Sequence, residues 1–144
     1  MFQSKVDLCQ SQTIPFMPNR RQRRGKTAYQ TGVSAEQAVE RIYVAKGAAI
    51  LGRRVKTPFG EIDLVADASG TLIFIEVKAR RHNIGCESPI KPAQWERLKN
   101  AANHYMLPVL SETGVHPACR FDAALMDRIG QVTIYENACS FDEQ

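Results

Sequence analysis

Two stretches decide the fold of this chain: Gly60-Glu-Ile-Asp-Leu-Val-Ala-Asp67 and Thr71-Leu-Ile-Phe-Ile-Glu-Val-Lys-Ala-Arg80. Both are rich in β-branched and aromatic residues, which are typical of strands. The Ser69-Gly70 pair between them is a turn signal, so the pattern predicts a β-hairpin. If this pair forms a two-residue loop, the strands pair symmetrically about it and Asp63 stands opposite Glu76.

Charged side chains interrupt these apolar strands, and the informative ones are Asp63, Glu76 and Lys78. Opposed Cβ atoms in an antiparallel pair lie about 4.5–5.5 Å apart, so the two carboxylates repel each other unless a cation lies between them. Side-chain alternation places Lys78 on the same face as Glu76. Oxygen ligands suit Mg²⁺ or Mn²⁺, and a neighbouring lysine can stabilise charge on a phosphate. These groups are the ones that metal-assisted phosphodiester hydrolysis requires.

A cross-strand network of ion pairs is the alternative interpretation. In that case Glu61 pairs with Lys78, while Asp63 and Glu76 bind other basic side chains. Burying a lone charge costs several kcal/mol, so each charge needs a partner or a metal. The agreement between the spacing and the predicted hairpin register favours the metal site.

The rest of the chain predicts one α/β domain with the order αβββαββ and a central mixed sheet flanked by helices. Helical spacing predicts a first helix from the N-cap Ser34 to about Gly47, and a second from Pro92 to about Leu110. Additional strands are predicted at 48–56, 120–127 and 131–135.

The predicted organisation is a flexible basic arm at residues 1–30, an endonuclease-like domain at 31–139 and a short tail at 140–144. The net charge of +4 comes from the arm, where six basic residues accompany one acid, because the remaining 13 basic and 14 acidic residues leave the rest of the chain slightly negative. Such an arm suits a polyanion such as DNA, and a merely solvated extension is the alternative. Met17 is a candidate for an internal start of translation.

Several classes of protein are excluded by composition. No run of about 18 apolar residues exists, and the N-terminus lacks a secretory signal, so we expect a cytoplasmic protein without a membrane span. The four cysteines include no C-x-x-C pair, and the three histidines add no ligand-spaced set, which argues against a zinc site.

The hairpin also carries a resemblance. Its blocks Gly60-Glu-Ile-Asp-Leu-Val-Ala66 and Phe74-Ile-Glu-Val-Lys-Ala-Arg80 resemble the YraN-like family of small bacterial proteins. Weaker matches lie at Gly32–Glu36, Arg120-Phe-Asp122 and Asn137-Ala138, so that roughly residues 30–139 are covered. The family is similar to archaeal Holliday-junction resolvases, which implies a restriction-endonuclease-like fold with a PD-(D/E)-x-K site.

The resemblance implies roles for individual residues. Asp63 matches the acid of the nuclease core, and Glu76 and Lys78 match the (D/E)-x-K pair, so these three are the expected catalytic residues. Asp63 and Glu76 are also expected metal ligands, together with the carbonyl of Val77 and the side chain of Glu36. A first-turn glutamate stabilised by the helix dipole is the alternative for Glu36.

Basic residues near the hairpin are the expected contacts to nucleic acid, because such side chains make most phosphate contacts. They are Arg53, Arg54, Arg80 and Arg81, and a solvated strand is the alternative for each. Gln94 stands where the family commonly has a basic residue. This departure weakens the expected binding of nucleic acid and leaves the acids intact.

The expected function is therefore a Mg²⁺- or Mn²⁺-dependent endonuclease acting on DNA, including branched or structured DNA. The alternative is a non-catalytic nucleic-acid-binding module that keeps the fold, because fold alone does not prove activity. A role in protein interaction is neither supported nor excluded. Resolvase-like cleavage of two strands implies a homodimer, for which the sequence shows no surface.

Overall fold

The computed structural model describes residues 28–79 and 90–139. Its elements are α2 (Ala28–Ala45), β1 (Ala49–Thr57), β2 (Gly60–Ala68), β3 (Thr71–Ala79), α3 (Pro92–Thr113), β4 (Cys119–Met126) and β5 (Val132–Cys139). This order confirms the predicted αβββαββ arrangement. Residues 1–27 of the predicted arm and the predicted tail lie outside the described residues, so that part of the domain division stays a prediction.

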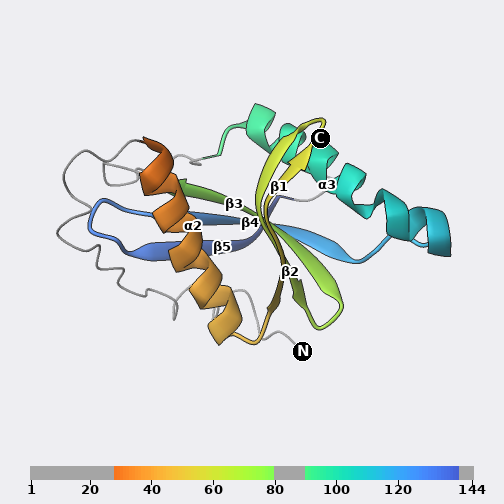
Figure 1. Cartoon of the computed structure of the whole chain (residues 1–144), viewed down its shortest axis with the longest axis horizontal. Coiled ribbons are helices and arrows are strands. Elements are labelled where there is room, and N and C mark those ends of the chain that lie inside the picture. Colours follow the sequence, from red (N-terminus) through yellow and green to blue (C-terminus); the bar gives the residue numbers. More distant parts are fainter. Residues whose placement is uncertain (1–27, 80–89, 140–144) are drawn as a thin grey trace.

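The strands form a five-stranded mixed sheet in the order β1-β2-β3-β4-β5. The neighbours are antiparallel except for β3 and β4, which run parallel. A parallel pair needs a long crossover connection, and α3 supplies it between these two strands (Figure 1).

The two helices cover opposite faces of the sheet (Figure 1). The core under α2 contains Ala35, Val39, Ile42, Tyr43, Leu64, Ile73, Ile75 and Ile134, among others. The core under α3 contains Ile62, Val65, Phe74, Leu98, Ala101, Ala102, Met106, Phe121 and Cys139. The molecule is thus an α/β domain, consistent with a restriction-endonuclease-like core, as the sequence predicted.

The turn between β2 and β3 is the two-residue loop that the sequence predicted. Ser69 and Gly70 both have positive φ, at 53° and 92°. Two such residues in succession are typical of the tight turn whose twist suits a hairpin. The side chain of Asp67 supports the turn, because its Oδ1 accepts a hydrogen bond of 2.9 Å from the Gly70 N–H.

The register that follows from this turn is confirmed. The ladder between β2 and β3 extends from Ala68 and Thr71 to Leu64 and Ile75. Asp63 and Glu76 follow directly after the last pair of this ladder, so the two acids stand on adjacent strands.

Helix α2 starts earlier than the sequence indicated. It begins at Ala28, so Ser34 lies inside the helix and the prediction of an N-cap at Ser34 was wrong. A single glycine such as Gly32 costs a helix only about 1 kcal/mol, which is too little to end it. The predicted end is confirmed, because α2 stops at Ala45 and Gly47 follows with a φ of 90°.

Helix α3 begins at Pro92 as predicted and ends three residues beyond the predicted Leu110. Gly114 stops it with a φ of 69°, and its N–H donates to the Leu110 carbonyl at 2.8 Å. Trp95 and Tyr105 pack against the α3 core. Of the helices in the described part of the chain, none is long and apolar enough to cross a membrane.

Candidate active site

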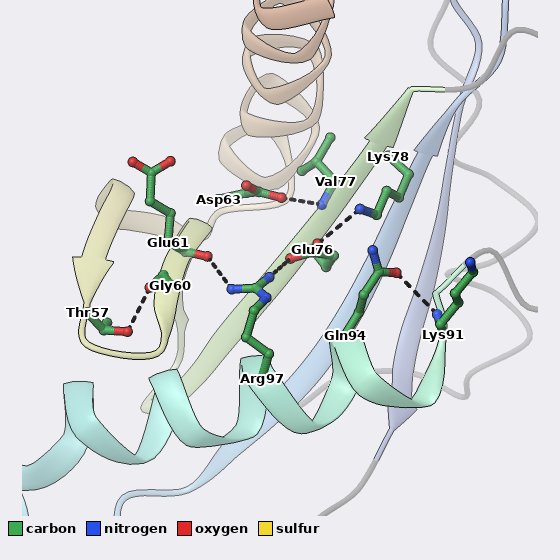
Figure 2. Close-up of polar contacts among 10 residues, drawn as sticks. All are labelled: Thr57, Gly60, Glu61, Asp63, Glu76, Val77, Lys78, Lys91, Gln94 and Arg97. Carbon is green, nitrogen blue, oxygen red and sulfur yellow. Dashed lines mark hydrogen bonds and ion pairs between the residues drawn. The ribbon is translucent and has the colours of Figure 1, made fainter.

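The site lies where the pairing of β2 with β3 ends. Beyond the last backbone pair, formed by Leu64 and Ile75, the side chain of Asp63 turns to the neighbouring strand. Its Oδ2 accepts a hydrogen bond of 2.8 Å from the Val77 N–H (Figure 2). This bond orients the carboxylate and satisfies a backbone donor at the end of the ladder.

Strand β2 is irregular at this point. Ile62 belongs to the core under α3, whereas Leu64 belongs to the core under α2. Residues two apart in a regular strand share a face, so β2 changes its orientation at the intervening Asp63. The acid is therefore placed between the two helical layers, where its side chain is half-buried.

Strand β1 is irregular opposite the same residue. Its residues Arg53 and Val55 pair with Leu64 and Ile62, which leaves Arg54 facing Asp63. Arg54 has a φ of 47°, a left-handed conformation that a residue with a side chain rarely adopts. Strained backbone of this kind occurs preferentially at functional sites.

The irregular backbone lets two consecutive arginines reach α2. Arg54 Nε and Nη2 donate to Glu36 at 2.9 and 3.2 Å, which is a two-pronged ion pair. Arg53 makes a second pair with Glu40, one turn further along α2, and its side chain is 62 % exposed. The structure therefore brings Arg54 to the acids and holds Arg53 outside them.

Glu76 is the most buried acid of the site, with 4 % of its surface exposed. Lys78 Nζ lies 3.4 Å from its Oε1, and Arg97 Nη2 lies 3.1 Å from its Oε2. Arg97 also donates to the Glu61 carbonyl at 2.8 Å (Figure 2). Each oxygen of the Glu76 carboxylate thus faces one basic side chain.

The acids of the site are electrostatically linked through Asp63. Burial raises the pKa of Glu76, and the negative charge of Asp63 raises it further. Burial also raises the pKa of Glu36, where the hydrogen bonds from Arg54 oppose the shift and Asp63 again adds to it. The pKa of Asp63 itself is raised by burial, against the Val77 N–H. Three negative charges are therefore disfavoured together, which is the situation that a cation relieves.

The donor set suits a hard divalent cation, because it consists of carboxylate oxygens and backbone carbonyls. Asp63 lies within electrostatic reach of both Glu76 and Glu36. Within the described residues, however, no three His, Cys, Asp or Glu side chains stand close enough together to hold an ion as they are. Glu36 is turned to Arg54 and must leave it to join the other two acids.

The remaining predicted site residues are Gln94, Arg80, Arg81 and the carbonyl of Val77. Gln94 lies in the first turn of α3, and its Oε1 accepts a hydrogen bond of 3.2 Å from the Lys91 N–H (Figure 2). Arg80 and Arg81 lie outside the described residues. The carbonyl of Val77 stays a predicted ligand.

Sequence reasoning missed Arg97. The available signal was its distance of three residues from Gln94, which places both on the same side of a helix. The proposed pairing of Glu61 with Lys78 was wrong: Lys78 contacts Glu76, and the exposed Glu61 carboxylate points away from it (Figure 2). Glu61 contributes its backbone carbonyl instead.

These observations define the class of the protein: a restriction-endonuclease-like fold with an acid–acid–lysine set on its second and third strands. The comparisons then give the family. The sequence model described as uncharacterised protein family UPF0102 matches residues 35–126. The chain belongs to this family, also known as the YraN family, and the predicted resemblance is confirmed.

Several relatives support the same assignment. A UPF0102 protein from Cereibacter sphaeroides is 38% identical over 114 residues, covering 79% of this chain and 96% of that protein. One from Rhodopseudomonas palustris strain BisB5 is 40% identical over 99 residues, covering 69% and 74%. One from Ruegeria sp. strain TM1040 is 36% identical over 115 residues, covering 80% and 91%.

Proposed function

We propose that this chain is a Mg²⁺- or Mn²⁺-dependent endonuclease that hydrolyses phosphodiester bonds in DNA, including branched or structured DNA. One observation carries the proposal. Asp63 and Glu76 stand on adjacent strands, Glu76 is buried and Asp63 half-buried, and the charge of Asp63 raises the pKa of Glu76. Neighbouring buried carboxyls with raised pKa values are more typical of a functional site than of a structural one.

The metal would be held by Asp63, Glu76, Glu36 and the Val77 carbonyl, and when bound it supplies a Lewis acid and an activated water. The Val77 N–H fixes the orientation of the Asp63 carboxylate through its bond of 2.8 Å. Lys78 holds its ammonium group 3.4 Å from Glu76 with its side chain 30% exposed. It therefore places positive charge and N–H donors beside the acids, where a phosphate oxygen can receive them.

A non-catalytic nucleic-acid-binding module is the second candidate, and one observation favours it. Glu36 is paired with Arg54, and both oxygens of Glu76 are paired with Lys78 and Arg97. A site whose acids are already neutralised by the protein's own cations can persist without a metal. In that case the basic side chains alone would contact phosphate.

The test is a cleavage assay on linear, flapped and four-way DNA with Mg²⁺ or Mn²⁺. We expect cleavage by the wild type and a loss of at least about 100-fold in Asp63→Asn, the scale of removing a central electrostatic contributor. Asp67→Asn is the matched control, because Asp67 lies on the same strand and only supports the turn at Gly70. It should cleave like the wild type.

Three results separate the candidates. Cleavage that survives Asp63→Asn would trace to a contaminant and overturn the proposed active site. Binding of DNA without cleavage by any variant supports the non-catalytic module. Paired cuts in the four-way DNA imply two sites, so we then expect a homodimer by sedimentation at the assay concentration.

A further inference from the structure

Arg97 is built into the site more firmly than a surface arginine. It bridges the Glu76 carboxylate at 3.1 Å and the Glu61 carbonyl at 2.8 Å, and so connects α3 to both strands of the hairpin. The backbone next to it makes room for its head group. A Cβ added at Gly60 would lie 2.9 Å from Arg97 Nη1, and the φ of 114° at Gly60 also disfavours a side chain.

The guanidinium has more N–H donors than its two protein acceptors use. It carries five N–H donors, and two of its nitrogens are engaged with Glu61 and Glu76. The Arg97 side chain is 32 % exposed, so solvent and a ligand can reach it. Its charge also lowers the pKa of Asp63, which shows that Arg97 lies within electrostatic reach of both acids.

We propose that Arg97 is the phosphate-binding cation of this site, and that Glu76 holds it until a divalent metal takes over that carboxylate. The inference rests on the proposed function and deepens it, since it assigns the contact to the nucleic-acid backbone. A guanidinium fits phosphate through two parallel N–H bonds, which a lysine cannot make. Arg97 serves as the cation for Glu76 before the metal arrives and as the cation for the phosphate afterwards.

This exchange has a signature that a purely supporting role lacks. The metal and Arg97 compete for Glu76, so removing Arg97 should tighten metal binding. The phosphate and Glu76 compete for Arg97, so metal binding should tighten DNA binding. If Arg97 only positioned Glu76 for the metal, its removal would weaken the binding of both.

The experiment compares wild type, Arg97→Gln and Arg41→Gln at pH 8. Arg41→Gln is the control, because it removes the same charge from an exposed position on α2. Calorimetry measures the affinity for Mn²⁺ alone. Fluorescence anisotropy measures the affinity for labelled four-way DNA with EDTA and with Ca²⁺, an oxygen-preferring cation, and a gel verifies that the DNA stays intact.

For Arg97→Gln we expect Mn²⁺ binding about 5-fold tighter than in the wild type, at the low end of typical coupling between sites. We expect DNA binding about 10-fold weaker than in the wild type when Ca²⁺ is present, and within about 2-fold of it in EDTA. Arg41→Gln should weaken DNA binding slightly and equally with and without the metal, because it lacks contact with the acids.

Two outcomes would overturn the inference and remain distinguishable. If the wild type binds Mn²⁺ and cleaves DNA, but Arg97→Gln weakens Mn²⁺ binding or loses DNA affinity equally in EDTA, the proposed function stands and the exchange is wrong. If the wild type binds no divalent cation, both fail together.

A measurement on the wild type covers the case in which the variant does not fold. Side-chain NMR of the arginine Nε–H groups should show the Arg97 signal shift on adding Mg²⁺, because its partner Glu76 is taken by the ion. The Arg120 signal, which reports on the separate ion pair with Asp122, should stay in place. An Arg97 signal that ignores Mg²⁺ under conditions where calorimetry shows binding would contradict the exchange.

Discussion

Two polar clusters lie in this domain, and they are built on opposite principles. Around Asp122, which is fully buried, the donors are complete: Tyr43 Oη at 2.7 Å, Arg120 Nε and Nη2 at 3.1 Å each, and the Asn137 N–H at 2.9 Å. These bonds join α2, β4 and β5. Asp122 and Arg120 thus form an ion pair within β4.

The cluster around Asp63 contains three acids, and its basic side chains are more exposed than Arg120 is in the Asp122 cluster. Asp63 adds to the raised pKa values of both Glu36 and Glu76. Its basic partners, Arg54, Lys78 and Arg97, remain about one third exposed, at 30%, 30% and 32%. We therefore expect the Asp122 cluster to stabilise the fold, whereas the raised pKa values around Asp63 are what the proposed metal site requires.

The largest expected effect tests the structural cluster. Asp122→Ala removes the buried acceptor of the Tyr43 hydroxyl, the Asn137 N–H and two Arg120 nitrogens, while Arg120 keeps its ion pair with Glu136. Each buried donor left without an acceptor costs about 1–3 kcal/mol, so we expect a loss of about 3 kcal/mol in the free energy of unfolding. Urea unfolding followed by circular dichroism measures it. A loss below about 1 kcal/mol, the size of a single ordinary hydrogen bond, would show that the cluster does not hold the layers together.

The second effect is specific to the Asp63 cluster. A divalent cation that binds only the folded state stabilises it by about 2.7 kcal/mol when its concentration is 100 times the dissociation constant. We expect Mn²⁺ to raise the melting temperature of the wild type and not that of an Asp63→Ala, Glu76→Ala double variant. Equal shifts in both proteins would place the ion elsewhere.

A milder test returns to the Asp122 cluster. Tyr43→Phe removes one buried hydrogen bond and keeps the ring, so we expect a loss of about 1 kcal/mol in the free energy of unfolding. Fluorescence-monitored urea unfolding provides the value. If the variant is as stable as the wild type, the bond of 2.7 Å between Tyr43 and Asp122 makes no net contribution.

The smallest effect is expected at Glu76. Glu76→Gln removes a disfavoured charge and leaves Lys78 and Arg97 partly hydrated, so at pH 8 the variant should equal the wild type or exceed it by about 1 kcal/mol or less. A clear drop in the melting temperature would support the structural ion-pair interpretation over the functional one.

The raised pKa values also predict how the contribution of Asp63 and Glu76 to the free energy of unfolding changes with pH. Because burial raises the folded pKa values of Asp63 and Glu76, the folded chain binds more protons than the unfolded chain above pH 4 or so. This contribution to stability is fully present below the unfolded pKa of about 4 and is lost as the pH rises through the folded pKa values.

The corresponding measurement uses an Asp63→Asn, Glu76→Gln double variant. The unfolding free energy of the wild type minus that of the variant should fall as the pH rises from 4 to 8. A difference that grows with pH would mean that the basic neighbours stabilise the two carboxylates more than burial destabilises them.

Much of the fold could be predicted from the sequence, because turn residues and hydrophobic spacing act between near neighbours. The Ser69-Gly70 turn established the hairpin register, and helical spacing after Pro92 predicted α3. The start of α2 was misjudged, because an N-cap signal at Ser34 competes with a helix that continues through it from Ala28.

Less of the site could be predicted from the sequence, because its ion pairs join residues that are far apart in the chain. Glu36 meets Arg54, which lies 18 residues away, and Glu76 meets Arg97, which lies 21 residues away. Alternation along a strand predicts that Arg53 and Arg54 face opposite sides. The left-handed backbone at Arg54 instead directs both toward α2, and no local pattern announces it.

The sequence by itself determined the order of elements, the hairpin register and the placement of Asp63, Glu76 and Lys78 on it, because turn chemistry and strand periodicity act between near neighbours. Only the tertiary structure decided which cations the acids meet. It brought α2 and α3 to opposite faces of the sheet, and so delivered Arg54 to Glu36 and Arg97 to Glu76. Ion pairs are decided by distance in space, which helix packing sets and spacing along the chain does not.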